Sequence, residues 1–231
     1  MKKLYFIAPF LIQSTLWWLV MRPIFNIFAK MEITGLENLR GLSGSVIFAP
    51  NHSNEVDPVL LPLTLPLWSR FSPLFFVARE RKYYQKPFFG LRGRFLYNEL
   101  SFALLGAYPV LEGKKNYALS LKNHLGILKD GGSVVIFPEG HMTKDGNLGP
   151  AHGGVGYLAY ASDFPVIPVY IHGTFGFNFR SLFQGKEKIN VTFCKPLSTA
   201  DLFARKGEPT VDEYHRAADM VLGEVEEQAN A

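Results

Sequence analysis

The chain has 231 residues, of which 48% are hydrophobic, 14% aromatic and 19% charged. Disordered proteins combine low hydrophobicity with high charge, so this composition excludes that class. The charged share lies below the about 25% of typical soluble domains, which argues against a surface that faces only water. The single cysteine, Cys194, excludes an internal disulfide framework and a multi-cysteine metal site.

The formal net charge of +4 is unevenly distributed along the chain. Of the 24 basic and 20 acidic residues, the segment 199–231 holds three and eight, so the rest of the chain has a net charge of +9. A basic body of this kind suits an anionic partner, such as a phospholipid surface, a phosphorylated substrate or nucleic acid.

We expect two units, an N-terminal membrane-associated helical element over residues 1–30 and a main domain over residues 31–231. Leu4 to Met21 contains no charged residue. A membrane-spanning helix needs about 20 apolar residues, so this run is borderline. Trp17 and Trp18 belong to a residue type that prefers the membrane interface. These features predict two short helices with a bend that enter one leaflet. A full span, a signal peptide and a buried core helix remain alternatives, and the run does not lead into the small-residue cleavage site of a signal peptide.

Beyond residue 30, strand patterns alternate with helix patterns, which is typical of an α/β fold. The predicted strands cover residues 31–35, 44–50, 72–78, 133–137, 166–171 and 188–194. The predicted helices begin near Pro58 or cover residues 114–130, 153–162 and 211–227, and the last of these is amphipathic.

Residues 70–94 carry seven basic side chains and seven aromatic rings but one acidic residue, Glu80. Such a mixture can bind single-stranded nucleic acid by stacking. It can also lie at a bilayer surface, with rings at headgroup depth and cations near phosphates. The apolar N-terminus favours the bilayer. An ordinary basic loop with a few core rings is a third interpretation.

His52 and Asp57 are the first candidates for catalysis. His52 follows the predicted strand 44–50, and Asp57 comes five residues later, directly before Pro58. Since proline favours the first helical position and aspartate the N-cap, we expect Asp57 to open the next helix. The turn then brings the carboxylate onto the imidazole and leaves the other ring nitrogen as a general base. A plain helix cap and a core histidine remain alternatives for these residues.

A second polar segment, Phe137-Pro138-Glu139-Gly140, follows the predicted strand 133–137. A carboxylate and a glycine at a strand end lie where α/β proteins bind ligands. Each motif alone is a weak signal, but the ordered set with the later strand around Pro168 is more specific.

The ordered set resembles the glycerolipid acyltransferase family, of the lysophosphatidate acyltransferase type, over roughly residues 44–175. The first motif of that family is matched by Asn51, His52 and Asp57, the third by Phe137-Pro138-Glu139-Gly140, and the fourth by Val166-Ile167-Pro168-Val169. The resemblance implies an α/β fold with a mixed sheet flanked by helices, and N-terminal helices that lie on the membrane.

The resemblance also implies roles for these residues. His52 is the general base, Asp57 orients its ring, and Asn51, Glu139 and Gly140 belong to the substrate-binding part of the site. The chain departs from the family at Glu112 and Met142, which stand where arginines that hold the acceptor phosphate are expected.

Other cations lie near these two positions in the sequence. Lys114, Lys115 and Lys144 are candidates to bind the phosphate as point charges. His141 and His152 are further candidates, weighed against a role as ordinary polar residues. Alternatively, the acceptor is not a simple phosphomonoester.

The resemblance thus implies a membrane-associated O-acyltransferase of phospholipid biosynthesis, with its active site at the cytoplasmic face. The expected partners are membrane phospholipids, a lysolipid acceptor, and acyl-CoA or acyl carrier protein as donor. No nucleic acid, metal or further cofactor is expected. A non-catalytic lipid-binding homologue is the alternative. The motifs of serine hydrolases (G-x-S-x-G) and P-loop enzymes (G-x-x-x-x-G-K-[ST]) are absent from the sequence.

Overall fold

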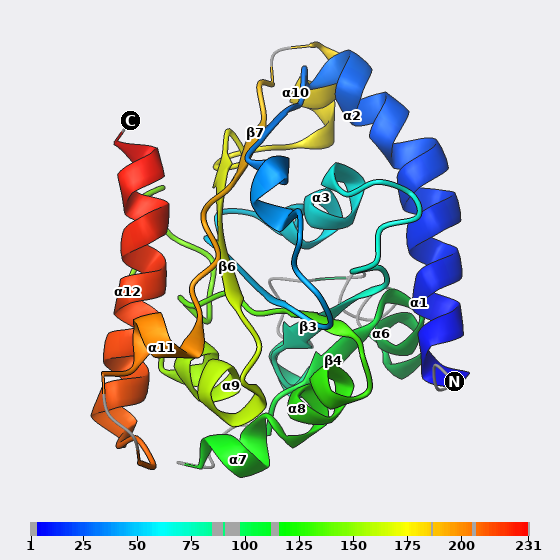
Figure 1. Ribbon diagram of the computed structural model, residues 1–231. Helices are drawn as coiled ribbons and strands as arrows, with labels where there is room; N and C mark the ends of the chain where they lie inside the picture. Colours follow the sequence, from blue (N-terminus) through cyan, green and yellow to red (C-terminus); the bar gives the residue numbers. More distant parts are fainter. Residues whose placement is uncertain are drawn as a thin grey trace.

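The computed structural model describes residues 4–84, 90, 98–111, 116–185, 187–204 and 207–230. Within these residues the centre is a seven-stranded sheet in the order β1-β7-β6-β2-β5-β3-β4 (Figure 1). The strands are β1 (Glu32–Thr34), β2 (Ile47–Pro50), β3 (Leu74–Ala78), β4 (Ala107–Pro109), β5 (Ser133–Val135), β6 (Val166–His172) and β7 (Asn190–Phe193). Neighbouring strands pair parallel except β6 and β7, which confirms the mixed sheet.

Helices cover both faces of this sheet. They are η1 (Leu4–Phe6), α1 (Ile7–Ile12), η2 (Gln13–Met21), α2 (Arg22–Phe28), η3 (Leu36–Leu39), α3 (Asp57–Thr64), α4 (Arg81–Tyr84), α6 (Glu99–Leu105), α7 (Tyr117–Ser120), α8 (Lys122–Lys129), α9 (Gly154–Ser162), α10 (Phe179–Phe183), α11 (Thr199–Leu202) and α12 (Val211–Ala229). The predicted helix over 114–130 is divided into α7 and α8 at Leu121, whose backbone is not helical.

The side chains of β2 show how the two layers of helices are packed. Phe48 belongs to a core with residues of η2, α2 and α3, whereas Ile47 and Ala49 belong to a second core with residues of α8, α9 and α12. Successive residues of a strand point to opposite faces, so a strand buried on both faces is a continuous apolar run. This explains why the buried strands were visible in the sequence.

The chain crosses between the two layers beside β2. It leaves β2 through α3 on one face, and it passes from β5 to β6 through α9 on the other face. Because β5 and β6 flank β2, the strand order reverses direction there. Ligands of open α/β sheets bind outside the carboxyl ends of the strands at such a switch point. His52 and Glu139 follow β2 and β5 at this edge.

The N-terminal segment forms an uninterrupted run of helical turns from Leu4 to Phe28, in place of the two predicted short helices with a bend. Pro23 therefore lies inside this run, and because proline has no N–H it cannot donate a hydrogen bond to the preceding helical turn. The preceding turns of η2 have π-helical hydrogen bonding. One side of this N-terminal helix is buried through Phe6, Trp17 and Phe25.

Gln13 joins the N-terminal helix to the sheet. Its side chain is buried, Nε2 donates to the carbonyl oxygen of Leu74, and Oε1 accepts from the N–H of Leu74, both at 2.8 Å. A polar residue that dilutes an apolar run in the sequence is thus a specific link to the first residue of β3.

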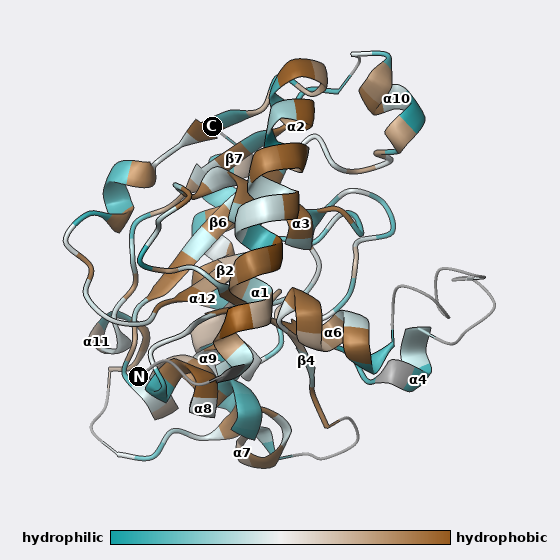
Figure 2. Cartoon of the chain, turned by 90° about the vertical axis from the view of Figure 1, so that its right-hand side faces the viewer, coloured by the Kyte–Doolittle hydropathy of each residue, from teal (hydrophilic) through white to brown (hydrophobic). Residues whose placement is uncertain are grey.

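The opposite side of the N-terminal helix is exposed and apolar, and Figure 2 shows it facing the viewer. We call this surface, together with neighbouring apolar residues, the apolar outer face. Its exposed members are Ile7, Leu11, Leu16, Leu19, Val20, Ile27, Trp68, Leu100, Phe179 and Phe183. Ring contacts of Phe10 with Trp68 and of Phe28 with Phe183 place these two members beside the helix, and α6, which carries Leu100, lies against α1. Among the described residues, no helix has both the length and the apolar content needed to cross a membrane.

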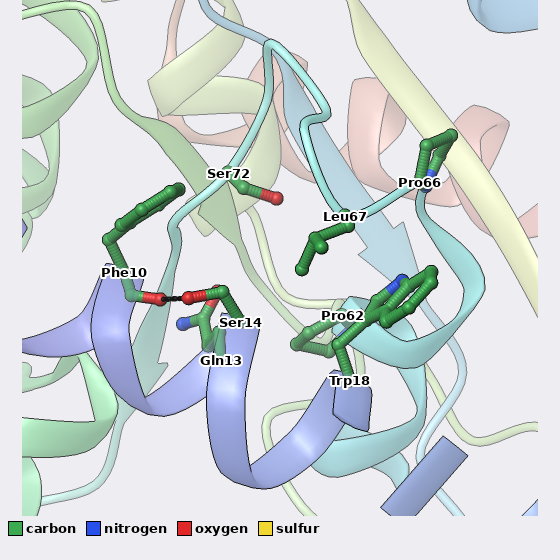
Figure 3. Close-up of a pocket in the computed structure, with 8 residues that line it drawn as sticks. All are labelled: Phe10, Gln13, Ser14, Trp18, Pro62, Pro66, Leu67 and Ser72. Carbon is green, nitrogen blue, oxygen red and sulfur yellow. Dashed lines mark hydrogen bonds between the residues drawn. The ribbon is translucent and has the colours of Figure 1, made fainter. Parts of the chain in front are cut away.

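A small hollow lies between the N-terminal helix and the segment that follows α3 (Figure 3). Its volume is about 10 Å³, roughly the space of one water molecule. Its lining residues are Phe10, Gln13, Ser14, Trp18, Pro62, Pro66, Leu67 and Ser72. The hollow therefore does not accommodate a fatty acyl chain.

Only part of the basic and aromatic stretch 70–94 lies on the surface of the protein. Phe71, Phe75 and Phe76 are buried core residues, so the membrane-surface interpretation was wrong for these rings. The guanidinium of Arg79 lies 4.1 Å from the centre of the Tyr83 ring. Residues 85–89 and 91–97, which include Lys86, Arg92 and Arg94, lie outside the described residues.

Candidate active site

His52 and Asp57 are in direct contact in the loop between β2 and α3. Nδ1 of His52 lies 2.9 Å from Oδ2 of Asp57, which also accepts hydrogen bonds from the N–H groups of Ser53 and Asn54, at 2.7 and 2.8 Å. Asp57 is fully buried and is the first residue of α3. Its carboxylate therefore turns back onto the preceding loop, and it is more than a plain helix cap.

The environment of His52 leaves one ring nitrogen available. Because an ionised carboxylate only accepts hydrogen bonds, Nδ1 is the donor in the contact with Asp57. The ring stacks on Phe137, with centroids 4.0 Å apart, and the side chain is 17% exposed. Within the described part of the chain no hydrogen-bond partner of Nε2 is found. An oriented, partly exposed imidazole of this kind can accept a proton from a ligand.

Glu139 supports the backbone of this loop. Its side chain is 1% exposed, Oε1 accepts from the N–H of His52, and Oε2 accepts from the N–H of Gly149, both at 2.8 Å. Both carboxylate oxygens are thus bound to the protein itself. The structure places Glu139 against the backbone of His52, where its side chain supports the loop, and its role in substrate binding stays a prediction.

The segment after Glu139 folds over the same loop. The N–H of Thr143 donates to the carbonyl oxygen of His52 at 2.8 Å, so His52 is bonded on both sides of its backbone. Gly140 adopts a φ of +66°, and a Cβ atom there would lie 2.9 Å from Cδ2 of His152. Lys144 is exposed one residue beyond Thr143. Lys114 and Lys115 lie outside the described residues.

Asn51 connects the loop to β6. It is buried, its Nδ2 donates to the carbonyl oxygen of Ile171 at 2.9 Å, and its Oδ1 accepts from the N–H of Ile171 at 2.7 Å. The side chain continues the pairing of β2 with β6 by one step. Both polar atoms of Asn51 are therefore engaged within the sheet, and its place in the structure is a support for the turn rather than a substrate contact.

Two residues of the site, Thr143 and Gly149, were not singled out in the sequence. They contribute only backbone N–H groups, and such contacts leave no mark on residue type. Phe137, the first residue of the predicted motif, supplies the surface on which His52 stacks. No group of three or more His, Cys, Asp or Glu side chains within the described ranges is arranged to bind a metal ion.

Comparison with known proteins decides the family of this site. The Acyltransferase family profile matches residues 30–172, which include the whole loop and the segment after β5. The chain belongs to the acyltransferase family. The match confirms the resemblance drawn from the motifs.

Two plant relatives of this acyltransferase family member are chloroplastic 1-acyl-sn-glycerol-3-phosphate acyltransferases. The protein from Brassica napus is 28% identical over 150 residues, which cover 64% of this chain and 38% of the relative. The protein from Arabidopsis thaliana is 29% identical over 150 residues, 64% of this chain and 37% of the relative. The chain thus spans less than two fifths of the length of these relatives.

A solved structure has the same fold. The crystal structure of the 1-acyl-sn-glycerophosphate acyltransferase PlsC from Thermotoga maritima superposes with a TM-score of 0.61 and 18% identity, covering 96% of this chain and 80% of that one. The likeness extends over almost the whole of this chain, and at this identity it shows a common fold.

Proposed function

We propose that this protein is a membrane-associated O-acyltransferase that moves a fatty acyl group from acyl-CoA or acyl carrier protein to a lysophospholipid hydroxyl. The observation that carries the proposal is the buried carboxylate of Asp57 on Nδ1 of His52, with Nε2 left for a substrate proton. The names of the plant relatives support a 1-acylglycerol 3-phosphate as the acceptor.

In the proposed reaction Nε2 of His52 removes the proton of the acceptor hydroxyl, whose oxygen attacks the thioester carbonyl. The ester bond forms, the carbon–sulfur bond breaks, and the leaving thiolate takes the proton from Nε2. Asp57 holds the ring in the required tautomer and stabilises the imidazolium formed in between. Glu139 and Thr143 hold the backbone of His52 in place. The step needs no metal, no covalent enzyme intermediate and no cofactor besides the acyl donor.

The membrane association is proposed on the apolar outer face. Six exposed apolar residues of the N-terminal helix lie together with Trp68, Leu100 and two phenylalanines of α10 on one side of the molecule. Contiguous apolar patches of this kind mark interaction sites for proteins or membranes. The guanidinium of Arg22 lies 4.9 Å from the centre of the Trp18 ring, and a cation beside an indole suits the headgroup layer. In this arrangement the helix lies in one leaflet, and the active site faces the cytoplasm.

The test is acyl transfer by purified protein, with lysophosphatidate as acceptor and acyl-CoA or acyl carrier protein as donor. His52→Ala should lower kcat by about 10²–10⁴, the range of general-base catalysis. Asp57→Asn should lower kcat by a similar factor, because the amide no longer fixes the tautomer. His172→Ala is the matched control, because His172 is an exposed histidine whose ring bonds to Tyr170.

Retained activity in His52→Ala would overturn the proposed role of the dyad. Absence of turnover by the wild-type protein with every lysophospholipid, together with binding of lipid vesicles, would instead support the non-catalytic lipid-binding alternative.

A further inference from the structure

Three histidine rings form a row beside the candidate active site. The ring centroids of His141 and His152 are 6.4 Å apart, and those of His152 and His215 are 6.5 Å apart. We call these residues the histidine row. They come from the segment after β5, from the residues directly before α9, and from the second turn of α12. His141 and His152 are exposed, so the row is accessible to a ligand.

The histidine row is attached to the loop that holds His52. Nδ1 of His141 lies 2.6 Å from the carbonyl oxygen of Glu139, and the N–H of His152 donates to the carbonyl oxygen of Pro138 at 2.8 Å. Gly140, which stands between Glu139 and His141 in the sequence, lies against the ring of His152. A ligand at the row is therefore bound by the same segment that supports the general base.

The charged surroundings of the row favour an anion. Burial lowers the pKa of His152, and the neighbouring His141, His215 and Arg79 lower it further. Within the described ranges, every charged group that shifts this pKa is thus a cation. Arg79 follows β3, at the same sheet edge as His52. Such a cluster repels protons until an anion compensates its charge.

A tyrosine of α7 contacts the third histidine of the row. The hydroxyl oxygen of Tyr117 lies 3.1 Å from Nε2 of His215, which leaves Nδ1 of that ring for a ligand. Burial raises the pKa of Tyr117, so this hydroxyl stays neutral and adds no negative charge. The ring of Tyr117 also stacks on Tyr157 of α9, and this contact fixes its position.

Building on the proposed acyl transfer, we propose that the histidine row binds the phosphomonoester group of a substrate. Charge-assisted N–H···O bonds are about 2.7–2.9 Å long, so two imidazoles at the spacing of this row can bond to oxygens of one phosphate. The row offers cations near Met142, where the resemblance led us to expect an arginine. The phosphomonoester is that of the lysophosphatidate headgroup or the 3′-phosphate of CoA.

The experiment compares acceptors and donors that differ in this group. Lysophosphatidate carries a phosphomonoester and lysophosphatidylglycerol a phosphodiester, while acyl-CoA has a 3′-phosphate that acyl carrier protein lacks. We expect His152→Gln to lower kcat/KM for the phosphomonoester substrate about tenfold, the effect of one lost charge-assisted hydrogen bond. For the other substrate of that pair, kcat/KM of the variant should stay within about twofold of the wild-type value. A loss with lysophosphatidate assigns the row to the acceptor, and a loss with acyl-CoA alone assigns it to the donor.

The pH dependence gives a second measurement. Above pH 7 the phosphomonoester, with a second pKa of about 6, is almost fully charged, so a further rise in pH acts mainly on the row, where the remaining protonated fraction of His152 decreases. The ratio of kcat/KM for the two members of the pair should therefore fall with pH in the wild-type protein. The contribution of the general base cancels in this ratio, because both substrates need the same base. His152→Arg should keep the preference and flatten the pH profile, and His172→Gln should match the wild type.

A third measurement does not depend on turnover. Histidine signals followed by NMR during titration with glycerol 3-phosphate should show shifted resonances of His141 and His152 and a rise in the pKa of His152, and glycerol should leave these unchanged. Equal losses with both members of each pair in His152→Gln, or unchanged histidine pKa values with glycerol 3-phosphate, would overturn the proposal. Failure of acyl transfer in the wild-type protein would instead refute the proposed function, and the NMR titration would still test the row.

Discussion

The carboxylate of Glu139 accepts a hydrogen bond at 2.8 Å from the backbone N–H of His52, 87 residues earlier in the chain. The other oxygen of the same carboxylate accepts from Gly149. One buried side chain thus holds the loops that follow two neighbouring strands, β2 and β5. This relationship makes Glu139 a positioning residue of the proposed active site.

Glu139→Gln should weaken this support. The new amide group must face one of the two backbone N–H groups, so one buried hydrogen bond is lost. We expect kcat to fall about tenfold with KM nearly unchanged, and the free energy of unfolding to fall by about 1–3 kcal/mol. Steady-state kinetics and urea denaturation measure the two effects. Glu226→Gln, on the exposed side of α12, is the control. A raised KM for the acceptor with unchanged stability would show that Glu139 contacts the acceptor after all.

Gly140→Ala should disturb the histidine row. Alanine at a φ of +66° costs about 1–2 kcal/mol, and its Cβ would meet Cδ2 of His152 at 2.9 Å. Gly41→Ala separates the two causes, because Gly41 has a φ of +78° but no atom within 4 Å of the added Cβ. We expect both variants to unfold at lower urea concentration, and only Gly140→Ala to raise KM for lysophosphatidate. Equal kinetics in the two variants would contradict a binding role of His152.

His124 should make the free energy of unfolding depend on pH below about 6.5. It is fully buried, its Nε2 lies 3.0 Å from the carbonyl oxygen of Tyr108, and burial lowers its pKa from 6.5 to about 4. Between these pH values the unfolded chain binds a proton that the folded chain does not. The free energy of unfolding should therefore fall as the pH falls through this window, by about 3 kcal/mol.

Urea denaturation at pH 4.5, 5.5 and 7 measures this dependence, with His124→Gln as the comparison because glutamine can still donate to Tyr108 and does not titrate. The variant should show a flatter profile over the same window. Identical slopes in both proteins would assign the proton uptake to other groups.

The apolar outer face should control vesicle binding. Leu19→Asp and Ile27→Asp each place a charge on the exposed side of the N-terminal helix, and together they should lower the fraction bound to phosphatidylglycerol vesicles at least about tenfold. Sedimentation with the vesicles measures this fraction. Met220→Asp is the matched control, because Met220 is an exposed apolar residue of α12 on the other side of the molecule (Figure 1). Equal loss in the control would show a general effect of charge.

Much of the fold was predictable because its core strands are local signals. β2, β5 and β6 are buried on both faces, and each appears as a short apolar run. The contact of His52 with Asp57 was also predictable, because the six residues that join β2 to α3 leave the two side chains little room to separate. Asp57 at the start of α3 followed from Pro58 in the same way.

Long-range contacts could not be predicted from the sequence. Gln13 bonds to Leu74 across 61 residues, and Asn51 bonds to Ile171 across 120. In both cases an amide side chain pairs with a backbone, and a backbone partner has no characteristic residue type. Phe71, Phe75 and Phe76 were ambiguous for another reason, since a ring in a basic stretch has the same composition in a core as at a surface.

The pair formed by Gln13 and Leu74 has a mechanical consequence. A helix that dips into a bilayer on a flexible tether would let the catalytic body swing above the lipid headgroups. Here two hydrogen bonds join the helix to the first residue of β3, and β5 lies between that strand and β2. If the apolar outer face rests in a leaflet, the depth of His52 relative to the lipid surface is constant. Such a geometry selects acceptors by how far a hydroxyl reaches out of the membrane, before any headgroup is recognised.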